Sequence, residues 1–263
     1  MSKEKDGQHG VQSLEIGIRI LRAIVNGHRS MMLMDIAAAT DMPASKVHRY
    51  LVSFVRSGLV DRDPMTSRYD LGSFALTLGL VAVDRLDRIK LGLSAISELR
   101  DEINETTALA VWSDNGPVIV RSERPRRPIT VNVVTGSALD ILTSASGRVF
   151  AAWLPKSTVD PMISRALTVP ALSAGMQSAA AVDAMLANVR QQGVAAVVDY
   201  HLVPGVAAVA APVFNFNNEI TLTVLVIGVK SMIDVSPDGP VVTALKRSAQ
   251  ALSLRLGSSG GAD

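Results

Sequence analysis

One short segment constrains the fold more than any other, because its apolar and its basic residues lie on different sides of a helix. Within residues 43–58 the apolar side chains recur three or four positions apart, which is the period of one buried helix face. They are Val47, Leu51, Phe54 and Val55. Pro43 suits the opening of a helix, and Gly58 suits its end. Lys46 and Arg49 fall off the apolar stripe and share a face, because they are three positions apart.

The segment belongs to a longer pattern of helices and strands. Two helical stretches precede it, and two short strands joined by a polar turn follow it, at 59–62 and 68–71. Helix, helix, turn, helix and hairpin in this order are the layout of a winged helix-turn-helix. We therefore predict such a module over residues 11–72, followed by a linker helix over 73–90.

The rest of the chain predicts a second, larger domain. Over residues 91–256 helical stretches alternate with runs of strand-forming residues, which indicates an α/β arrangement. The whole chain of 263 residues is then an α+β protein with two domains. Residues 1–10 are polar and residues 257–263 are rich in Gly and Ser, so we expect a disordered leader and a disordered tail.

The composition excludes several classes of protein. The absence of cysteine removes disulfides, zinc fingers, iron–sulfur clusters and thiol nucleophiles. The four histidines form no H-E-x-x-H cluster, so we expect neither a metal site nor a cofactor. No run approaches the roughly 18 apolar residues of a membrane span, and the polar start has no secretory signal pattern. We therefore expect a cytoplasmic protein without a membrane partner.

Positive charge is concentrated in and just after residues 43–58. The net charge of the chain is only +2, but the stretch from Ser45 to Arg68 holds five Lys and Arg residues against two Asp. Such an excess is typical of a surface that faces phosphates. The alternative is an ordinary solvated helix face.

An α-helix fits the major groove of DNA, where each base pair presents a distinct pattern of donors and acceptors. A reading helix therefore needs an apolar back and a front of long donors and short polar groups, and residues 43–51 have both. The residues expected to contact DNA are Ser45, Lys46, His48 and Arg49 from the helix, with Arg62 and Arg68 from the strands. The alternatives are that Arg49 pairs within its own domain and that His48 packs beside Tyr50.

At many of these positions the sequence resembles the isocitrate lyase regulator (IclR) family of bacterial transcription factors. In the first domain the matching residues are 10–15, Ser45, Val47, His48, Arg49, 58–60, 62–64 and 68–72. In the second domain they are 146–148, Leu154, Pro155, Gly193, 204–206 and 210–213. The resemblance runs from about residue 10 to residue 256, and it depends on the order and spacing of these motifs.

The resemblance implies a winged-helix DNA-binding domain, an effector-binding domain with a GAF-like sheet, and no catalysis. It also implies a homodimer or homotetramer, whose paired recognition helices would read a palindromic operator in double-stranded DNA. The chain departs from the family at Ala44, Ser45 and Lys46, where members often carry Lys followed by Ser-Thr. A cation has moved by two positions, so the operator sequence does not follow from the resemblance. Whether the chain is a repressor or an activator depends on where its operator lies relative to a promoter.

The resemblance also bears on the effector. Members that bind small acids hold the carboxylate with polar groups at three strand positions, which are here Ala208, Leu225 and Ile227. Burying even a neutral polar group without a partner costs about 2–7 kcal/mol. We therefore expect an effector larger than pyruvate or glyoxylate and partly apolar or aromatic. The alternative is that these strands pack a dry core.

Other residues remain as polar contacts for an effector. They are Gly136, Ser137, Asp199 and His201, with Trp112 and Arg121 at the mouth of the site.

Three functions compete. A ligand-responsive regulator that binds DNA is favoured by the helix, the hairpin and the resemblance. The alternative is a ligand-sensing, dimeric interaction module without DNA binding, in which the helix-turn-helix serves dimerisation. A serine hydrolase that uses Ser144 or Ser146 is disfavoured, because neither lies in a G-x-S-x-G elbow and Ser144 suits a helix cap better. We predict that the chain is not an enzyme.

Overall fold

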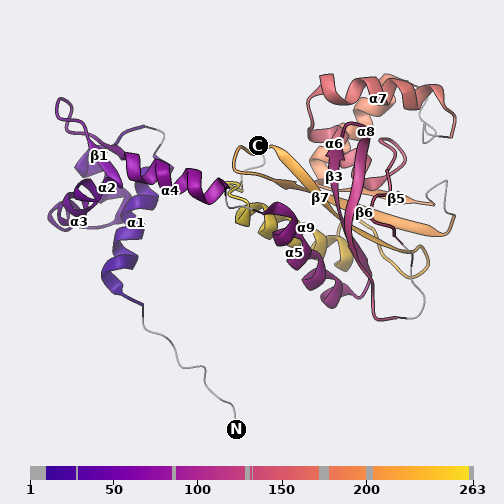
Figure 1. Cartoon of the computed structure of the whole chain (residues 1–263), viewed down its shortest axis with the longest axis horizontal. Helices are drawn as coiled ribbons and strands as arrows, with labels where there is room; N and C mark the ends of the chain where they lie inside the picture. Colours follow the sequence, from indigo (N-terminus) through magenta and orange to yellow (C-terminus); the bar gives the residue numbers. More distant parts are fainter. Residues whose placement is uncertain are drawn as a thin grey trace, which may run out of the picture. The chain divides into compact units, whose positions relative to one another are not determined.

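The computed structural model describes residues 10–27, 29–84, 87–127, 131, 133–171, 178–199 and 204–260. These residues form two compact units that divide between residue 84 and Asp87 (Figure 1). Of the leader predicted over residues 1–10, all but Gly10 lies outside the described residues. None of the helices in the described part of the chain is long and apolar enough to cross a membrane.

The first unit has the predicted order of helices and strands. The helices are α1 (Gln12–Asn26), α2 (Leu33–Thr40) and α3 (Ala44–Arg56). The hairpin of β1 (Val60–Arg62) and β2 (Tyr69–Leu71) follows, and then α4 (Ser73–Asp84). Met31, just before α2, pairs with Tyr69 through two backbone hydrogen bonds of 2.9 and 2.8 Å, so it adds a third backbone to the hairpin. The winged helix-turn-helix is therefore confirmed.

The core of this unit forms where its first three helices meet the hairpin. Ile20, Ile36, Val47, Leu51 and Val60 have no exposed surface. α1 approaches α3 closely at Gly17, where an added Cβ would lie 3.0 Å from the ring of Phe54. The apolar stripe predicted for α3 is thus largely buried, except for Val55, which is 38% exposed.

The single helix predicted over residues 73–90 is two helices in the structure. α4 ends at Asp84, and α5 (Arg88–Ile103) begins after a break. Asp87 explains the new start, because its carboxylate accepts hydrogen bonds from the backbone N–H groups of Ile89 (3.1 Å) and Lys90 (3.0 Å). A side chain that satisfies first-turn N–H groups in this way is an N-cap, which opens a helix rather than continuing one.

The second unit is built on a five-stranded sheet. Its strands are β3 (Thr106–Ser113), β4 (Gly116–Glu123), β5 (Ala195–Val198), β6 (Val206–Phe214) and β7 (Ile220–Val229). They lie in the order β4-β3-β7-β6-β5, and all neighbours are antiparallel. The helices α6 (Ala145–Trp153) and α8 (Ala179–Gln192) pack on one face of the sheet, while α5 and α9 (Pro240–Arg255) pack on the other (Figure 1). The α+β class is therefore confirmed.

α6 packs on the sheet so closely that its serines and its glycine have structural roles. Ser144 caps the helix by accepting a hydrogen bond from the N–H of Gly147 (2.9 Å), as predicted. Ser146 is fully buried and accepts a hydrogen bond from the Thr223 hydroxyl of β7 (3.0 Å). A Cβ on Gly147 would lie 2.1 Å from the carbonyl oxygen of Asp140. Neither serine is placed as a free nucleophile.

Two segments of the second unit differ from the prediction. The helix α7 (Lys156–Thr168) was not predicted, because Pro161 lies inside it and a proline usually ends a helix. In the tail predicted as disordered, residues 257–260 are described and Ser258 is buried, whereas residues 261–263 lie outside the described part. The Ser258 hydroxyl donates to Oδ1 of Asn218 and its N–H to the carbonyl of Ser253, both at 3.0 Å.

Candidate nucleic-acid interface and ligand site

α3 separates a buried side from an exposed side. Val47 and Leu51 have no exposed surface, whereas Ser45, His48 and Arg49 are exposed and Lys46 is half-buried. The structure therefore brings the four predicted residues of this helix together around one accessible side. No side chain caps the first turn, because the residue at the N-cap is a proline. Uncapped N–H groups at a helix N-terminus favour an anion such as phosphate.

The exposed side of α3 continues beyond the residues that the sequence singled out. Val52, Ser53 and Arg56 are also exposed. Ser53 lies one turn after Arg49, whereas Val52 lies two turns after Ser45 and Arg56 two turns after Arg49. The spacing of 45, 49, 52 and 56 follows the helical period, which was the signal available in the sequence. A small apolar side chain such as that of Val52 is suited to a thymine methyl group.

The two arginines of the hairpin already have partners in their own unit. The guanidinium of Arg62 donates to the hydroxyl of Ser67 (3.0 Å) and lies 5.7 Å from the ring centroid of Tyr69. Arg68 donates to the backbone carbonyl of Ser30 (2.7 Å). Both side chains are exposed, and a guanidinium carries five N–H donors, so these contacts leave donors available for phosphate.

The turn of the hairpin is held by a carboxylate. Asp63 accepts hydrogen bonds from the backbone N–H groups of Met65 (2.7 Å) and Thr66 (3.2 Å). These bonds stabilise the charged carboxylate, the bond from Met65 most of all, and hold the pKa of Asp63 below its usual range. An ionised Asp63 therefore stabilises the turn of the wing.

In the second unit, three predicted effector positions adjoin on one face of the sheet. Ala208 pairs directly with Ile227, and Leu225 lies two residues from Ile227, so all three point to the same side. Leu225 and Ile227 are only 3% and 8% exposed, and Ala208 is partly buried. They pack in the same apolar cluster as Phe150 of α6, whose ring lies 5.6 Å from that of Trp112.

The predicted polar contacts lie at opposite edges of the sheet. Gly136 and Ser137 pair with the edge strand β4, because the Gly136 N–H donates to the Ile119 carbonyl (2.7 Å) and the Ile119 N–H donates to the Ser137 carbonyl (3.0 Å). Asp199 follows the other edge strand, β5.

Asp199 is engaged by its own unit rather than free. It forms an exposed ion pair with Lys230, whose hydrogen bond lowers the pKa of the Asp199 carboxyl. The Asp199 carboxylate also accepts a hydrogen bond from the Gly205 N–H (3.3 Å). Arg121, predicted at the mouth, is exposed and donates to the carbonyl of Val120 (2.8 Å). His201 lies outside the described residues.

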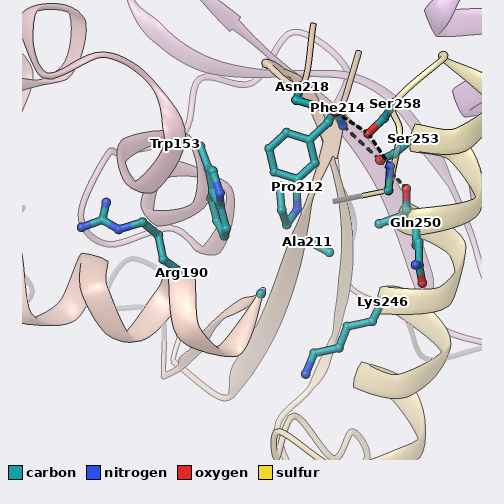
Figure 2. A pocket seen from close by; sticks show the side chains of 13 residues that line it. Trp153, Arg190, Ala211, Pro212, Phe214, Asn218, Lys246, Gln250, Ser253 and Ser258 are labelled. Atoms are coloured by element: carbon teal, nitrogen blue, oxygen red, sulfur yellow. Dashed lines mark hydrogen bonds between the residues drawn. The ribbon is translucent and has the colours of Figure 1, made fainter. Parts of the chain in front are cut away.

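A further hollow of about 490 Å³ lies elsewhere on the second unit, and the sequence did not predict it (Figure 2). We call it the β6-edge pocket, after the strand end that forms its floor. The residues that line it include Trp153, Arg190, Pro212, Phe214, Lys246 and Gln250. The signal in the sequence was weak, because these residues come from α6, α8, β6 and α9 and only the fold brings them together. Among the described residues, no group of His, Asp and Glu could hold a metal ion.

Comparisons with known proteins agree with these two units. Residues 13–64 match the family model described as the IclR helix-turn-helix domain, and residues 81–254 match the bacterial transcriptional regulator IclR C-terminal model. The glycerol operon regulatory protein of Streptomyces griseus is 28% identical over 256 residues, which span 94% of this chain and 97% of the relative. The transcriptional repressor IclR of Escherichia coli is 24% identical over 211 residues, 80% of this chain and 77% of the relative.

A solved structure gives the same result. The crystal structure of Pseudomonas aeruginosa HmgR is 37% identical, covers 95% of this chain and 100% of its own, and superposes with a TM-score of 0.87. The two family models together cover both units of the present chain. The relatives are named as regulatory proteins of transcription, in agreement with the matched models. The chain therefore belongs to the IclR family of bacterial transcriptional regulators.

Proposed function

We propose that the exposed side of α3 reads an operator in double-stranded DNA and that a small organic effector bound to the second unit controls this binding. The observation that carries the proposal is the placement of Ser45, His48 and Arg49 on the exposed side of α3 above the buried pair Val47 and Leu51. A helix with this distribution presents donors to base edges while its back holds it in the domain. The role is regulatory rather than enzymatic.

Phosphate contacts position the duplex. Lys46 lies at the border of the exposed side, near the uncapped first turn of α3, where an anion is favoured. Arg62 and Arg68 reach from the wing with the donors that Ser67 and Ser30 leave unused. Such contacts fix the register of the protein on DNA without reading sequence, so specificity comes from the residues of α3.

A second copy of the chain covers α4 and pairs the recognition helices. From Ser73 to Val83 this helix carries no charged residue, and Phe74, Leu76 and Leu80 are 44%, 65% and 61% exposed. A helix that is apolar on every side is normally buried, so its exposure in a single chain supports a homodimer, or a homotetramer built from dimers. Two-fold symmetry in the protein then calls for a palindromic operator.

The effector is larger than a two- or three-carbon acid and partly apolar or aromatic. Ala208, Leu225 and Ile227 offer no donor, and Trp112 and Phe150 border the same cluster. Gly136, Ser137, Asp199 and His201 are the proposed polar contacts. Isothermal calorimetry with pyruvate, glyoxylate and larger aromatic acids tests the assignment. We expect no heat from the two small acids at micromolar concentration, and micromolar binding of either would contradict the effector class.

Selection of bound fragments from genomic and random DNA tests the function itself. We expect the full chain to enrich an inverted repeat whose half-site centres are separated by about one turn of the duplex, 10–10.5 base pairs, or a multiple of it. Absence of any enriched sequence, together with effector binding, would instead support an interaction module without DNA binding. Enrichment of a single unpaired half-site would contradict the proposed two-fold assembly while leaving DNA binding intact.

A further inference from the structure

The β6-edge pocket lies where β6 extends past the start of the neighbouring strand β5. β5 begins at Ala195, which pairs with Ala210, so no strand of the described part of the chain lies beside residues 211–214 of β6 on that side. Pro212 lies in this open stretch and has no N–H to offer to another strand, which fits an edge position. α6, α8 and α9 border the space that a further strand would occupy. Its volume of about 490 Å³ falls in the usual range for small-molecule sites.

The wall of the pocket is aromatic. The rings of Trp153 and Phe214 meet edge to face, with centroids 5.9 Å apart and planes at 73°. Figure 2 shows the rings of Pro212 and Phe214 between Trp153 on one side and α9 on the other. Rings that present both edges and faces bind flat apolar groups well. The pocket is therefore suited to a ring-sized apolar group.

The charge of the pocket is positive. The described residues that line it include no carboxylate, whereas Lys246 of α9 and Arg190 of α8 are both present. Arg190 donates to the carbonyl of Ala152 (2.7 Å), and its guanidinium lies beyond Trp153 from Phe214 (Figure 2). Lys246 is half-buried, and no residue of the described chain gives it a hydrogen bond or an ion pair. Lys246, rather than Arg190, is thus the cation on the Phe214 side of Trp153 (Figure 2).

A peptide strand is a poor occupant of this edge. The N–H of Phe214 already donates to the hydroxyl of Ser253 (3.0 Å), and Pro212 has no N–H. The polar groups of Asn218 and Ser258 are paired with each other (3.0 Å). Strand addition relies on free main-chain donors and acceptors, so a compact ligand fits better than an added strand.

We propose that the β6-edge pocket is a second ligand site, which binds a small aromatic carboxylate. The ring lies against Trp153, Pro212 and Phe214, and the carboxylate pairs with the ammonium group of Lys246, beside the amide of Gln250 one turn along α9. The site is separate from the predicted effector positions, because Ala208, Leu225 and Ile227 are not among the residues that line it. Its occupation does not depend on DNA binding, so the proposal goes beyond the regulatory function.

Tryptophan fluorescence of the full chain tests the site. The chain has two tryptophans, so Trp112→Phe leaves Trp153 as the only source of tryptophan emission. We expect benzoate to change this emission with saturation, and to bind about tenfold more tightly than the neutral benzamide, because a charge-assisted hydrogen bond is worth about that factor. Acetate, which has the charge but no ring, should bind at least as weakly as benzamide.

Variants of Lys246 assign the effect to the pocket. Lys246→Gln should raise the dissociation constant of benzoate about tenfold, to that of benzamide, and Lys246→Arg should restore most of the difference. Lys156→Gln is the matched control, since it removes an equally charged, exposed side chain of the same unit that does not line the pocket. Absence of saturation, equal affinities for benzoate and benzamide, or a benzoate affinity unchanged by Lys246→Gln would each overturn the proposal.

Discussion

The two units place their candidate site residues in opposite environments. In the first unit, Ser45, His48 and Arg49 lie exposed above a closed core. In the second, Leu225 and Ile227 are almost fully buried in the face of a sheet. An exposed polar face contributes little to holding a small domain together, so its residues are free to contact a partner. A buried apolar residue serves a core and a pocket wall equally well, and only a ligand separates the two roles.

The largest expected effect tests whether the two units fold separately. An added Cβ would lie 2.3 Å from the Gly58 carbonyl oxygen at Gly72 and 2.1 Å from the Asp140 carbonyl oxygen at Gly147. Neither backbone can move away cheaply, so Gly72→Ala and Gly147→Ala should each lower the free energy of unfolding of their own unit by about 3 kcal/mol or more. Both tryptophans are in the second unit, so the urea transition followed by their fluorescence should shift with Gly147→Ala alone.

Gly79→Ala is the steric control for this pair. No atom lies within 4 Å of its added Cβ, and alanine is the better helix former by about 1 kcal/mol. The variant should therefore leave the tryptophan transition of the second unit unchanged. Equal shifts of the tryptophan transition by Gly72→Ala and Gly147→Ala would show that the two units unfold together rather than separately.

The second unit buries a hydrogen-bonded polar pair, Ser146 and Thr223, whereas the polar site residues of the first unit lie at its surface. Ser146→Ala removes the acceptor of the fully buried Thr223 hydroxyl. An unpaired buried hydroxyl costs about 1–3 kcal/mol, so the tryptophan transition should move to lower urea while operator affinity is unchanged. Adding Thr223→Val removes the unpaired group and should recover part of the loss. A further, additive loss in the double variant would contradict the pairing.

The smallest effect concerns the wing of the first unit at acid pH. The pKa of Asp63 is held below its usual range by hydrogen bonds to the charged carboxylate, chiefly from the Met65 N–H. The ionised carboxylate therefore stabilises the fold above the pKa that Asp63 has in the unfolded chain. This stabilisation is lost as pH falls through the lower pKa that Asp63 has in the folded chain. Asp63→Asn should flatten this acid dependence in unfolding followed by circular dichroism. An equally steep loss in the variant would show that other groups cause it.

The winged helix-turn-helix could be predicted because local signals agree there. Val47 and Leu51 mark the buried side of α3, and the polar turn before Arg68 marks the hairpin. The break before α5 was missed because the cap at Asp87 lies inside a stretch that has helical spacing on both sides. α7 was not predicted because it contains Pro161, and a proline usually ends a helix.

The candidate sites show the same limit. The exposed residues of α3 follow from one helical period, so a single segment of sequence contains the signal. The β6-edge pocket combines Trp153, Phe214 and Lys246 from three elements that are distant in the chain. No local pattern joins them, and the space between them is open because β5 begins only at Ala195, opposite Ala210.

The role of α3 in reading DNA is tested most directly by Arg49→Ala on the selected operator. Binding is measured against every single-base change of a half-site, with Arg165→Ala, an exposed arginine of the second unit, as the control. We predict that Arg49→Ala weakens operator binding by about 1–3 kcal/mol and relaxes the preference at one base position, while the control changes neither. Unchanged affinity together with unchanged base preference in Arg49→Ala would contradict the account.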